Sequence, residues 1–325
     1  MEIPRPEPRR NLISPANISP GARPWSAGRR RETCLQLSFA RCVHSIWRML
    51  MARTLKKLPR SCRRRKKRWR DSLIMMKSCS GSSMICSAKV QLIYLLDRFA
   101  QNELGQTRLS LICINEFPGV DGFRGFGELT GEQLAALFPQ RQEVTQSQLD
   151  LGSRAWQAYS SAQAAGLIDL VDSDTSALPF LKGALTRHLQ RFPSTDNGLG
   201  RIESVGLELI AKGYPNFRSL FPAFGRREPE YGFGDSQFYL ELKRLVDAAT
   251  PLLTLSVEGN GAATDQAQML LSSFEISEYG KAVLAGEEDF VKSNGIDIWL
   301  GGVHLEGHES GWRWDEHAQE LLVVL

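Results

Sequence analysis

The feature that most constrains this chain is a change of character near residue 90. From Met1 to Lys89 the apolar residues occur in short groups, without the sustained period of about 3.6 or 2 residues that marks one face of a helix or strand. Residues 1–70 contain 20 lysines and arginines against 3 acidic residues, whereas residues 71–325 contain 20 against 33. The two parts therefore carry net charges of +17 and −13. A hydrophobic core is predicted only from Val90 onward.

The basic segment, residues 1–89, is open to several interpretations. A transit peptide should be an amphipathic stretch rich in arginine and serine, but the basic density peaks at residues 60–70, after several prolines. The run from Arg63 to Arg68 favours phosphate contacts, so binding of nucleic acid through residues 1–70 is one alternative. The cysteines of this segment include no C-x-x-C pair, which argues against a zinc site. Those cysteines are Cys34, Cys42, Cys62, Cys79 and Cys86.

We favour a different interpretation, in which residues 1–89 are translated from the wrong reading frame. If the printed frame is correct, we expect these residues to form a disordered arm. Read from the third base of the Met75 codon, the first two shifted codons encode Asp-Glu. Permitted codons after them can spell Ile/Val-Val-Leu-Trp-Phe-Glu-His-Asp-Leu-Phe-x-Gln. That string runs directly into Val90 and supplies a buried strand, a polar turn and the start of a helix. Sequencing the gene from the Met75 codon to the Val90 codon tests this hypothesis of a one-base error near Lys89–Val90.

Residues 90–195 predict an α/β domain with an incomplete, Rossmann-like sheet. A helix should begin near Val90, and the nearly continuous apolar run Arg108–Asn115 predicts a strand buried on both faces, with Cys113 as a core thiol. Thr130-Gly-Glu-Gln133 and Thr145-Gln-Ser-Gln148 are capping boxes, which predict that one helix covers Glu132–Phe138 and that another begins after Thr145. A later helix, capped at Asp174, should end near His188, and we expect a charged imidazole at the surface there.

A glycine loop between the predicted strand and the helix at Thr130 is a candidate phosphate site, because backbone amides at a helix start can hold an anion. The spacing of its glycines matches neither G-x-G-x-x-G nor the P-loop, so a mobile connector is the favoured alternative. The candidate residues are Gly122, Gly125, Gly127 and Thr130, in the loop that begins at Gly119.

After the polar stretch Ser194–Gly200, which we expect to separate domains, residues 201–290 predict three helices followed by a two-stranded hairpin. The helices are expected at 202–211, 217–224 and 236–249, the strands at 252–257 and 270–276, with a polar hairpin at 258–268 and a short final helix at 279–284. This is the order of a winged-helix domain. Residues 201–290 contain 8 basic and 14 acidic residues, so we favour a protein-binding domain over a DNA-binding one.

Residues 291–325 form a Trp/His-rich C-terminal motif. His304 and His308 are four residues apart, but the nearby glycines argue against a helix and no third ligand is identifiable, so no metal or other cofactor is predicted. An active site would use His304 as acid or base, oriented by Asp297 or Asp315. The favoured alternative is a cap that seals the core, with His304 hydrogen-bonded inside it. The candidate binding residues are Asn294, Asp297, Trp299, His304, Trp312, Trp314 and Asp315.

Several segments together resemble the bacterial proteins that carry the domain of unknown function 1835. The resemblance covers about residues 90–315, and it implies a cytoplasmic bacterial protein with this α/β architecture but implies no reaction. Members of that family have a Trp-Phe-Glu-His-Asp-Leu-Phe-type motif directly before the helix that begins here at Val90, which is the string that the shifted frame can spell. The segments are Val90–Phe99, Gly127–Phe138, Ala177–Lys182, Asn294–Leu305 and Trp312–Asp315.

These observations predict a cytoplasmic binding or regulatory protein whose winged-helix-like domain contacts a protein partner. The alternative is an enzyme acting on a nucleotide or a phosphorylated small molecule, whose site would combine the missing Glu-His-Asp with the Gly119–Gly127 loop and His304. The longest apolar runs are far shorter than the roughly 20 residues of a membrane-spanning helix, so no membrane partner is predicted.

Overall fold

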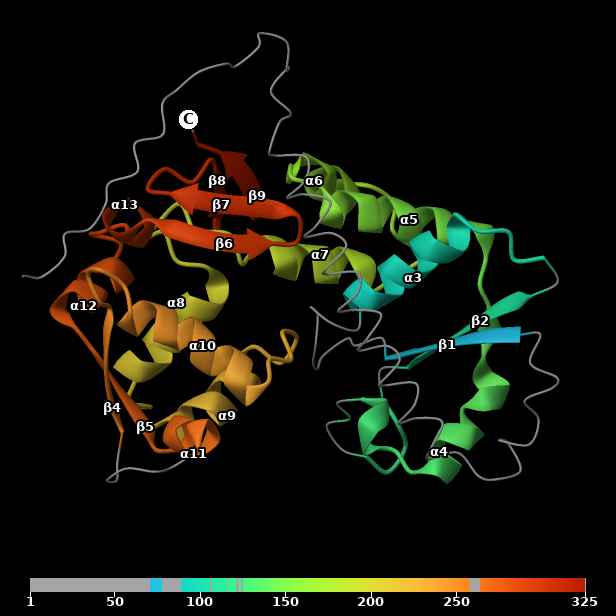
Figure 1. Ribbon diagram of the computed structural model, residues 1–325, viewed down its shortest axis with the longest axis horizontal. Helices are drawn as coiled ribbons and strands as arrows, with labels where there is room; N and C mark the ends of the chain where they lie inside the picture. The colour runs from blue at the N-terminus through green and yellow to red at the C-terminus, as the bar shows by residue number, and fades with distance from the viewer. Residues whose placement is uncertain are drawn as a thin grey trace, which may run out of the picture. The chain divides into compact units, whose positions relative to one another are not determined.

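A computed structural model describes residues 71–77, 89–105, 107–114, 116–120, 123, 125–257 and 264–324. Within these residues, helices alternate with small groups of strands, so the fold is mixed α/β (Figure 1). None of the helices in this part of the chain is long and apolar enough to cross a membrane. The predictions made for residues 1–70, for the five N-terminal cysteines and for Gly122 lie outside the described residues.

The first sheet has three strands, β1 (Asp71–Lys77), β2 (Arg108–Ile114) and β3 (Gln142–Glu143), in the order β1-β2-β3. β1 and β2 are parallel, with Asp71 opposite Arg108 and Lys77 opposite Ile114, whereas β3 is antiparallel to β2. The strand predicted over Arg108–Asn115 is present as β2, which covers Arg108–Ile114. No element was predicted at β1, because a run of four apolar residues between polar ones is too short to show a period.

The prediction that Cys113 is a core thiol is wrong, since its side chain is exposed. Leu109 and Leu111 lie on the same face of β2 and are buried in the first hydrophobic cluster. Cys113 is two residues further along that face, where the cluster no longer covers the strand. The apolar run in the sequence therefore predicted a longer buried stretch of β2 than the hydrophobic cluster covers.

Both predicted capping boxes are present. At the start of α4 (Gly131–Ala136), Gln133 N donates to Thr130 Oγ1 over 3.3 Å and Thr130 N donates to Gln133 Oε1 over 2.8 Å. Thr145 and Gln148 make the same pair of bonds at the start of α5 (Gln146–Ser160). These reciprocal bonds satisfy amides that a helix start would otherwise leave unpaired. Short 3-10 turns flank α4 at Phe126–Glu128 and Phe138–Gln140.

Helix α3 (Val90–Ala100) packs along α5, as its apolar spacing predicts. At their closest approach, a Cβ atom built on Gly152 would lie 2.4 Å from Leu96 Cβ, so α5 needs glycine there. The next helices are α6 (Ala165–Asp172), which was not predicted, and α7 (Leu181–Leu189), which begins later than predicted. The carboxylate of Asp174 accepts a bond from Ser176 N over 2.8 Å, so it closes a turn before α7 instead of capping the helix.

Beyond α7, helices α8 (Arg201–Ala211), α9 (Phe217–Arg227) and α10 (Asp235–Val246) lie beside the antiparallel hairpin of β4 (Leu253–Val257) and β5 (Ser272–Ile276) (Figure 1). Stacked rings of Phe217, Phe224 and Phe238 form the centre of their core. The connection predicted as a polar hairpin contains helix α11 (Asp265–Leu270), capped by Thr264. Helices α12 (Glu278–Leu284) and α13 (Phe290–Asn294) follow β5.

Two antiparallel hairpins close the described chain: β6 (Ile296–Leu300) with β7 (Val303–Gly307), and β8 (Trp312–Asp315) with β9 (Glu320–Val323). Buried residues of these hairpins, including Leu300 and Trp314, join the hydrophobic cluster of α3, α5, α6 and α7. A second cluster runs from Leu199 to Val291. The stretch expected to be a polar linker is largely buried, and Trp314 N donates to Pro193 O over 2.8 Å. The division into domains remains a prediction.

The turn of the β6–β7 hairpin fits tightly against the end of α5. Gly302 N donates to Tyr159 O over 2.8 Å, and a Cβ atom on Gly302 would lie 2.2 Å from Ser160 O. We expect Gly302→Ala to lower the free energy of unfolding by about 1–3 kcal/mol, because backbone atoms would have to move. Urea unfolding measures this change. Gly183→Ala in α7 is the control: a Cβ atom built there meets no atom within 4 Å, so this variant should raise the free energy of unfolding by up to about 1 kcal/mol.

Candidate functional site

Three of the predicted binding residues converge on the outer face of the β6–β7 hairpin. His304 Nε2 lies 2.7 Å from Asp297 Oδ1, and the His304 ring stacks on the Trp299 indole with centroids 4.3 Å apart and planes 5° from parallel. The strand register places Trp299 opposite His304 and Asp297 opposite Glu306. Glu306, which was not among the candidates, lies with its Oε2 3.8 Å from His304 Nδ1.

This face points to solvent. Trp299 is 48% exposed, and the side chains of Asp297 and Glu306 are 77% and 74% exposed. The prediction that His304 is hydrogen-bonded inside the core is therefore wrong, because the residues that alternate with His304 in β7, Val303 and Leu305, take the buried positions. Asp297 orients the imidazole as predicted for an acid/base pair, but on an open surface.

The remaining C-terminal candidates lie apart from this face. Asn294 Oδ1 accepts a bond from Thr250 N over 2.6 Å, and Asn294 Nδ2 is buried without a partner. Trp314 is buried and its indole donates to Glu316, whereas Trp312 is half-buried at the start of β8. The carboxylate of Asp315 accepts bonds from two backbone amides of the β8–β9 turn. Asn294 therefore links α13 to the segment before β4, whereas Trp312, Trp314 and Asp315 belong to the β8–β9 hairpin.

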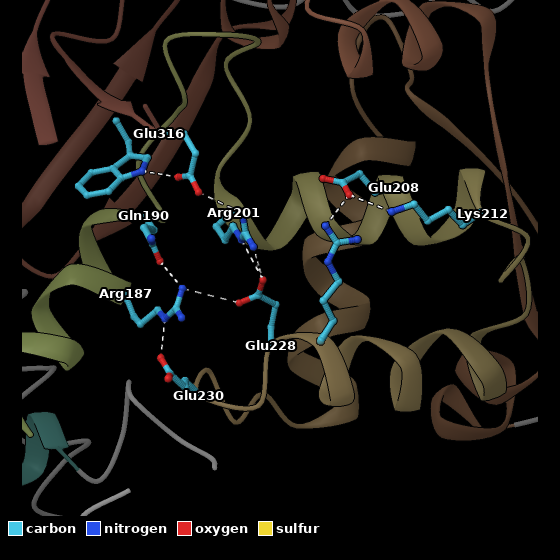
Figure 2. A network of polar contacts seen from close by, with 10 residues as sticks. Arg187, Gln190, Arg201, Glu208, Lys212, Glu228, Glu230 and Glu316 are labelled. Atoms are coloured by element: carbon cyan, nitrogen blue, oxygen red, sulfur yellow. Dashed lines mark hydrogen bonds and ion pairs between the residues drawn. The ribbon is translucent and has the colours of Figure 1, made fainter. Parts of the chain in front are cut away.

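A network of arginines and glutamates links α7, α8, the α9–α10 loop and the C-terminal turn (Figure 2). Its centre is Glu228, which is 4% exposed and accepts bonds from Arg201 Nη2 and Nε over 2.6 and 2.9 Å. Arg201 Nη1 also contacts Glu316 over 3.2 Å. Arg187 binds Glu230 through Nε over 2.5 Å, and its Nη1 lies 4.0 Å from Glu228. Residues that are distant in sequence meet here, so the sequence carried no signal for this network.

Both arginines of this network, Arg187 and Arg201, are paired with glutamates, and the three glutamates outnumber them. Burial lowers the pKa of the Arg201 guanidinium, but the Glu228 and Glu316 carboxylates outweigh it and raise that pKa above its usual value. The hydroxyl of Tyr231 is buried beside the network without a hydrogen-bond partner, and burial together with the Glu228 charge raises its pKa. Because the arginines form ion pairs with carboxylates of the same chain, this cluster is structural and does not offer cations to an anionic ligand.

The glycine loop gives limited geometric support to a phosphate site. Thr130 and the amide of Gln133 are already paired in the capping box, and α4 has only six residues. The backbone at Gly125 is extended, and a Cβ on Gly127 would meet nothing within 4 Å. The phosphate loop therefore stays a prediction, which rests on the order of strand, glycine loop and helix start in the sequence.

His188 departs most from its predicted surroundings. Expected at the surface as a charged imidazole, it is 3% exposed, and its ring lies 5.0 Å from that of Tyr159. Burial, followed by the charge of Arg191, lowers its pKa to about 3, so the imidazole is neutral near pH 7. It hydrogen-bonds the backbone of Leu300, its Nε2 has no partner, and it lines a cavity of about 20 Å³ with Tyr159 and Leu185. Tyr159, Phe192 and the backbone of Leu300 surround the ring, and contacts with residues as distant as these cannot be inferred from periodicity.

Within the described residues, no group of three or more His, Cys, Asp or Glu side chains is arranged to hold a metal ion. The hairpin face of Asp297, Trp299, His304 and Glu306 is then the one place where several predicted site residues meet, and we call it the Trp299 face. Its chemistry is that of a surface contact, in which an exposed indole stacks on an imidazole that lies near two carboxylates.

No family model, curated protein or solved structure matches this chain.

Proposed function

We propose that this chain is a binding or regulatory protein whose α8–β5 region is a winged-helix-like domain that contacts a protein partner. Three helices precede the β4–β5 hairpin, as in a winged helix. The segment between α8 and α9 also pairs with β5, since Phe274 N donates to Pro215 O over 2.8 Å and Asn216 forms an antiparallel bridge with Ser273. This isolated bridge beside the hairpin supports the winged-helix interpretation, although α11 lengthens the connection that would form the wing.

The surface of α10, which corresponds to the helix that reads DNA in such domains, favours a protein partner. Lys243 forms an ion pair with Asp247, and Arg244 Nη1 lies 3.0 Å from both Glu203 and Glu241. Both cations of this helix are therefore neutralised within the chain, which weakens any attraction for phosphates. Leu240, on the same helix, is 63% exposed. The internal pairing of both cations is the observation that carries the choice of a protein partner over DNA, and Leu240 is the exposed apolar side chain with which to test it.

Substitution of Leu240 tests the proposal. We expect Leu240→Glu in the full chain to reduce recovery of a cross-linked protein partner from cells by about tenfold or more, because a charge would replace an apolar contact. Val323→Glu is the matched control, since Val323 is 57% exposed but lies on β9, and it should leave recovery unchanged. Salt-sensitive binding of random duplex DNA that Lys243→Gln weakens and Leu240→Glu spares would contradict the proposal.

We also propose that the chain belongs to the domain of unknown function 1835 family, and that its N-terminal segment results from a frame error. The support is the resemblance of residues 90–315, together with the motif that the shifted frame can spell directly before α3. The sequencing experiment described above decides the second part. A confirmed printed frame would leave a basic arm, and salt-dependent binding of nucleic acid would then be the property to measure.

A further inference from the structure

We infer that the Trp299 face docks an arginine side chain, presented by an extended segment of a partner protein. The face consists of Asp297, Trp299, His304 and Glu306, on the outer side of the β6–β7 hairpin. The exposures given above show that Trp299 and both carboxylates are not covered by the described part of the chain. Tryptophan dominates the energetics of many protein interfaces, so a half-exposed one held in a fixed orientation marks a candidate contact.

The charge of the face calls for a cation. Asp297 and Glu306 occupy directly opposite positions in the strand register, and like charges at such positions destabilise a hairpin. Within the described part of the chain, the ion pairs of these two carboxylates are with His304 alone. A guanidinium placed between the carboxylates would relieve their repulsion. Phosphate-bearing ligands would meet the opposite effect, so the face suits neither nucleic acid nor a lipid headgroup.

The geometry favours arginine over lysine. One face of the Trp299 indole is covered by the His304 ring, and the residue still exposes about half of its surface. A planar guanidinium can stack on an indole and at the same time donate in its plane to two carboxylates, whereas an ammonium group is a compact point charge. The carboxylates of Asp297 and Glu306 therefore suit the N–H groups of a planar guanidinium better than they suit an ammonium group.

The hairpin holds this face in position before any partner binds. Leu300, Val303 and Leu305 anchor its inner side in the first hydrophobic cluster, and the turn is fixed to α5 by the bond from Gly302 N to Tyr159 O. A surface that is already held in place loses little conformational entropy on binding. This site is independent of the α10 surface, so either one can fail without the other.

Calorimetric titration of the full chain with the peptide acetyl-Gly-Arg-Gly-Arg-Gly-amide, at low and moderate salt, tests the inference. We expect weak binding that falls with salt, and an approximately tenfold loss of affinity in Trp299→Ala. Asp297→Asn combined with Glu306→Gln should cost about tenfold and remove most of the salt dependence. The lysine version of the peptide and free acetyl-arginine amide should both bind more weakly than the arginine peptide.

Controls separate binding from folding. Trp299→Leu keeps apolar bulk beside His304 but lacks the aromatic face, so it should lose affinity while its thermal unfolding midpoint stays close to that of the parent. Glu320→Gln removes an exposed carboxylate from β9 and should leave peptide affinity unchanged. The inference is overturned if the parent protein gives no binding heat at millimolar peptide. It is equally overturned if Trp299→Ala binds as tightly as the parent, or if free acetyl-arginine amide binds as well as the peptide.

Discussion

Glu228→Ala is expected to lower the free energy of unfolding by about 3 kcal/mol, the largest effect of any single substitution considered for this chain. The carboxylate is buried and accepts two bonds from Arg201, with Arg187 nearby on its other side (Figure 2). Its removal leaves the Arg201 charge partly buried and without its main partner. The Arg187 and Arg201 side chains remain 29% and 28% exposed, so water can compensate in part and the loss falls at the lower end of the usual range for buried pairs.

Urea unfolding of the parent, Glu228→Ala and Glu230→Ala measures this effect. Glu230 contacts the same Arg187, but its side chain is 41% exposed, and its removal should cost less than about 1 kcal/mol. Equal losses in the two variants would show that burial does not set the strength of this network.

The second large effect is a loss of stability in mild acid caused by His188. Its pKa is about 3 in the folded protein, against the ordinary value of 6.5, so between these pH values the unfolded chain binds a proton that the folded chain does not. The contribution of His188 is therefore present in full above pH 6.5 and is lost as the pH falls towards 3. The slope approaches about 1.4 kcal/mol per pH unit, which gives roughly 2.5 kcal/mol by pH 4.5.

His188→Phe removes the titrating group, although it also removes the bond to the Leu300 backbone, so the variant should be less stable than the parent at pH 7. Between pH 7 and pH 4.5 the difference in unfolding free energy should shift in favour of the variant by roughly 2.5 kcal/mol. Phe192→Leu, next to the His188 ring, is the control and should destabilise by the same amount at both pH values. A parallel pH dependence in the parent and His188→Phe would refute the assignment.

Local chemistry explains which elements the sequence predicted well. The helix starts at Thr130 and Thr145 depend on residues three positions away, and β2 depends on an uninterrupted apolar run, so both can be read in a short window. Helix α11 was missed because its first residues, Asp265 to Gln268, are mostly polar and resemble a turn. Burial was harder to predict, because the cover of His188 comes from the distant hairpin at Leu300, and Cys113 lies just beyond the cover of its strand.

The candidate site was predicted in composition but not in arrangement. The seven C-terminal candidates were grouped by nearness in sequence, yet a strand alternates its faces, so Asp297 and Trp299 point outward while Trp314 points into the core. The glycine pair at the turn sets the register that brings His304 opposite Trp299 and adds Glu306 to the face. That pairing could have been derived from the two glycines. The Glu228 network could not, because its members are brought together only by the packed helices.

The bonds from β8 to Pro193–Thr195 have a consequence for synthesis on the ribosome. The cluster from Leu199 to Val291 is continuous in sequence, so this segment can condense as soon as it has emerged. The cluster that begins at α3 needs Leu300, Trp314 and Leu321, which are made after the whole of that segment. The Leu199–Val291 cluster should therefore pack first, while α3 and α5 to α7 keep apolar surface open to chaperones until Leu321 has emerged.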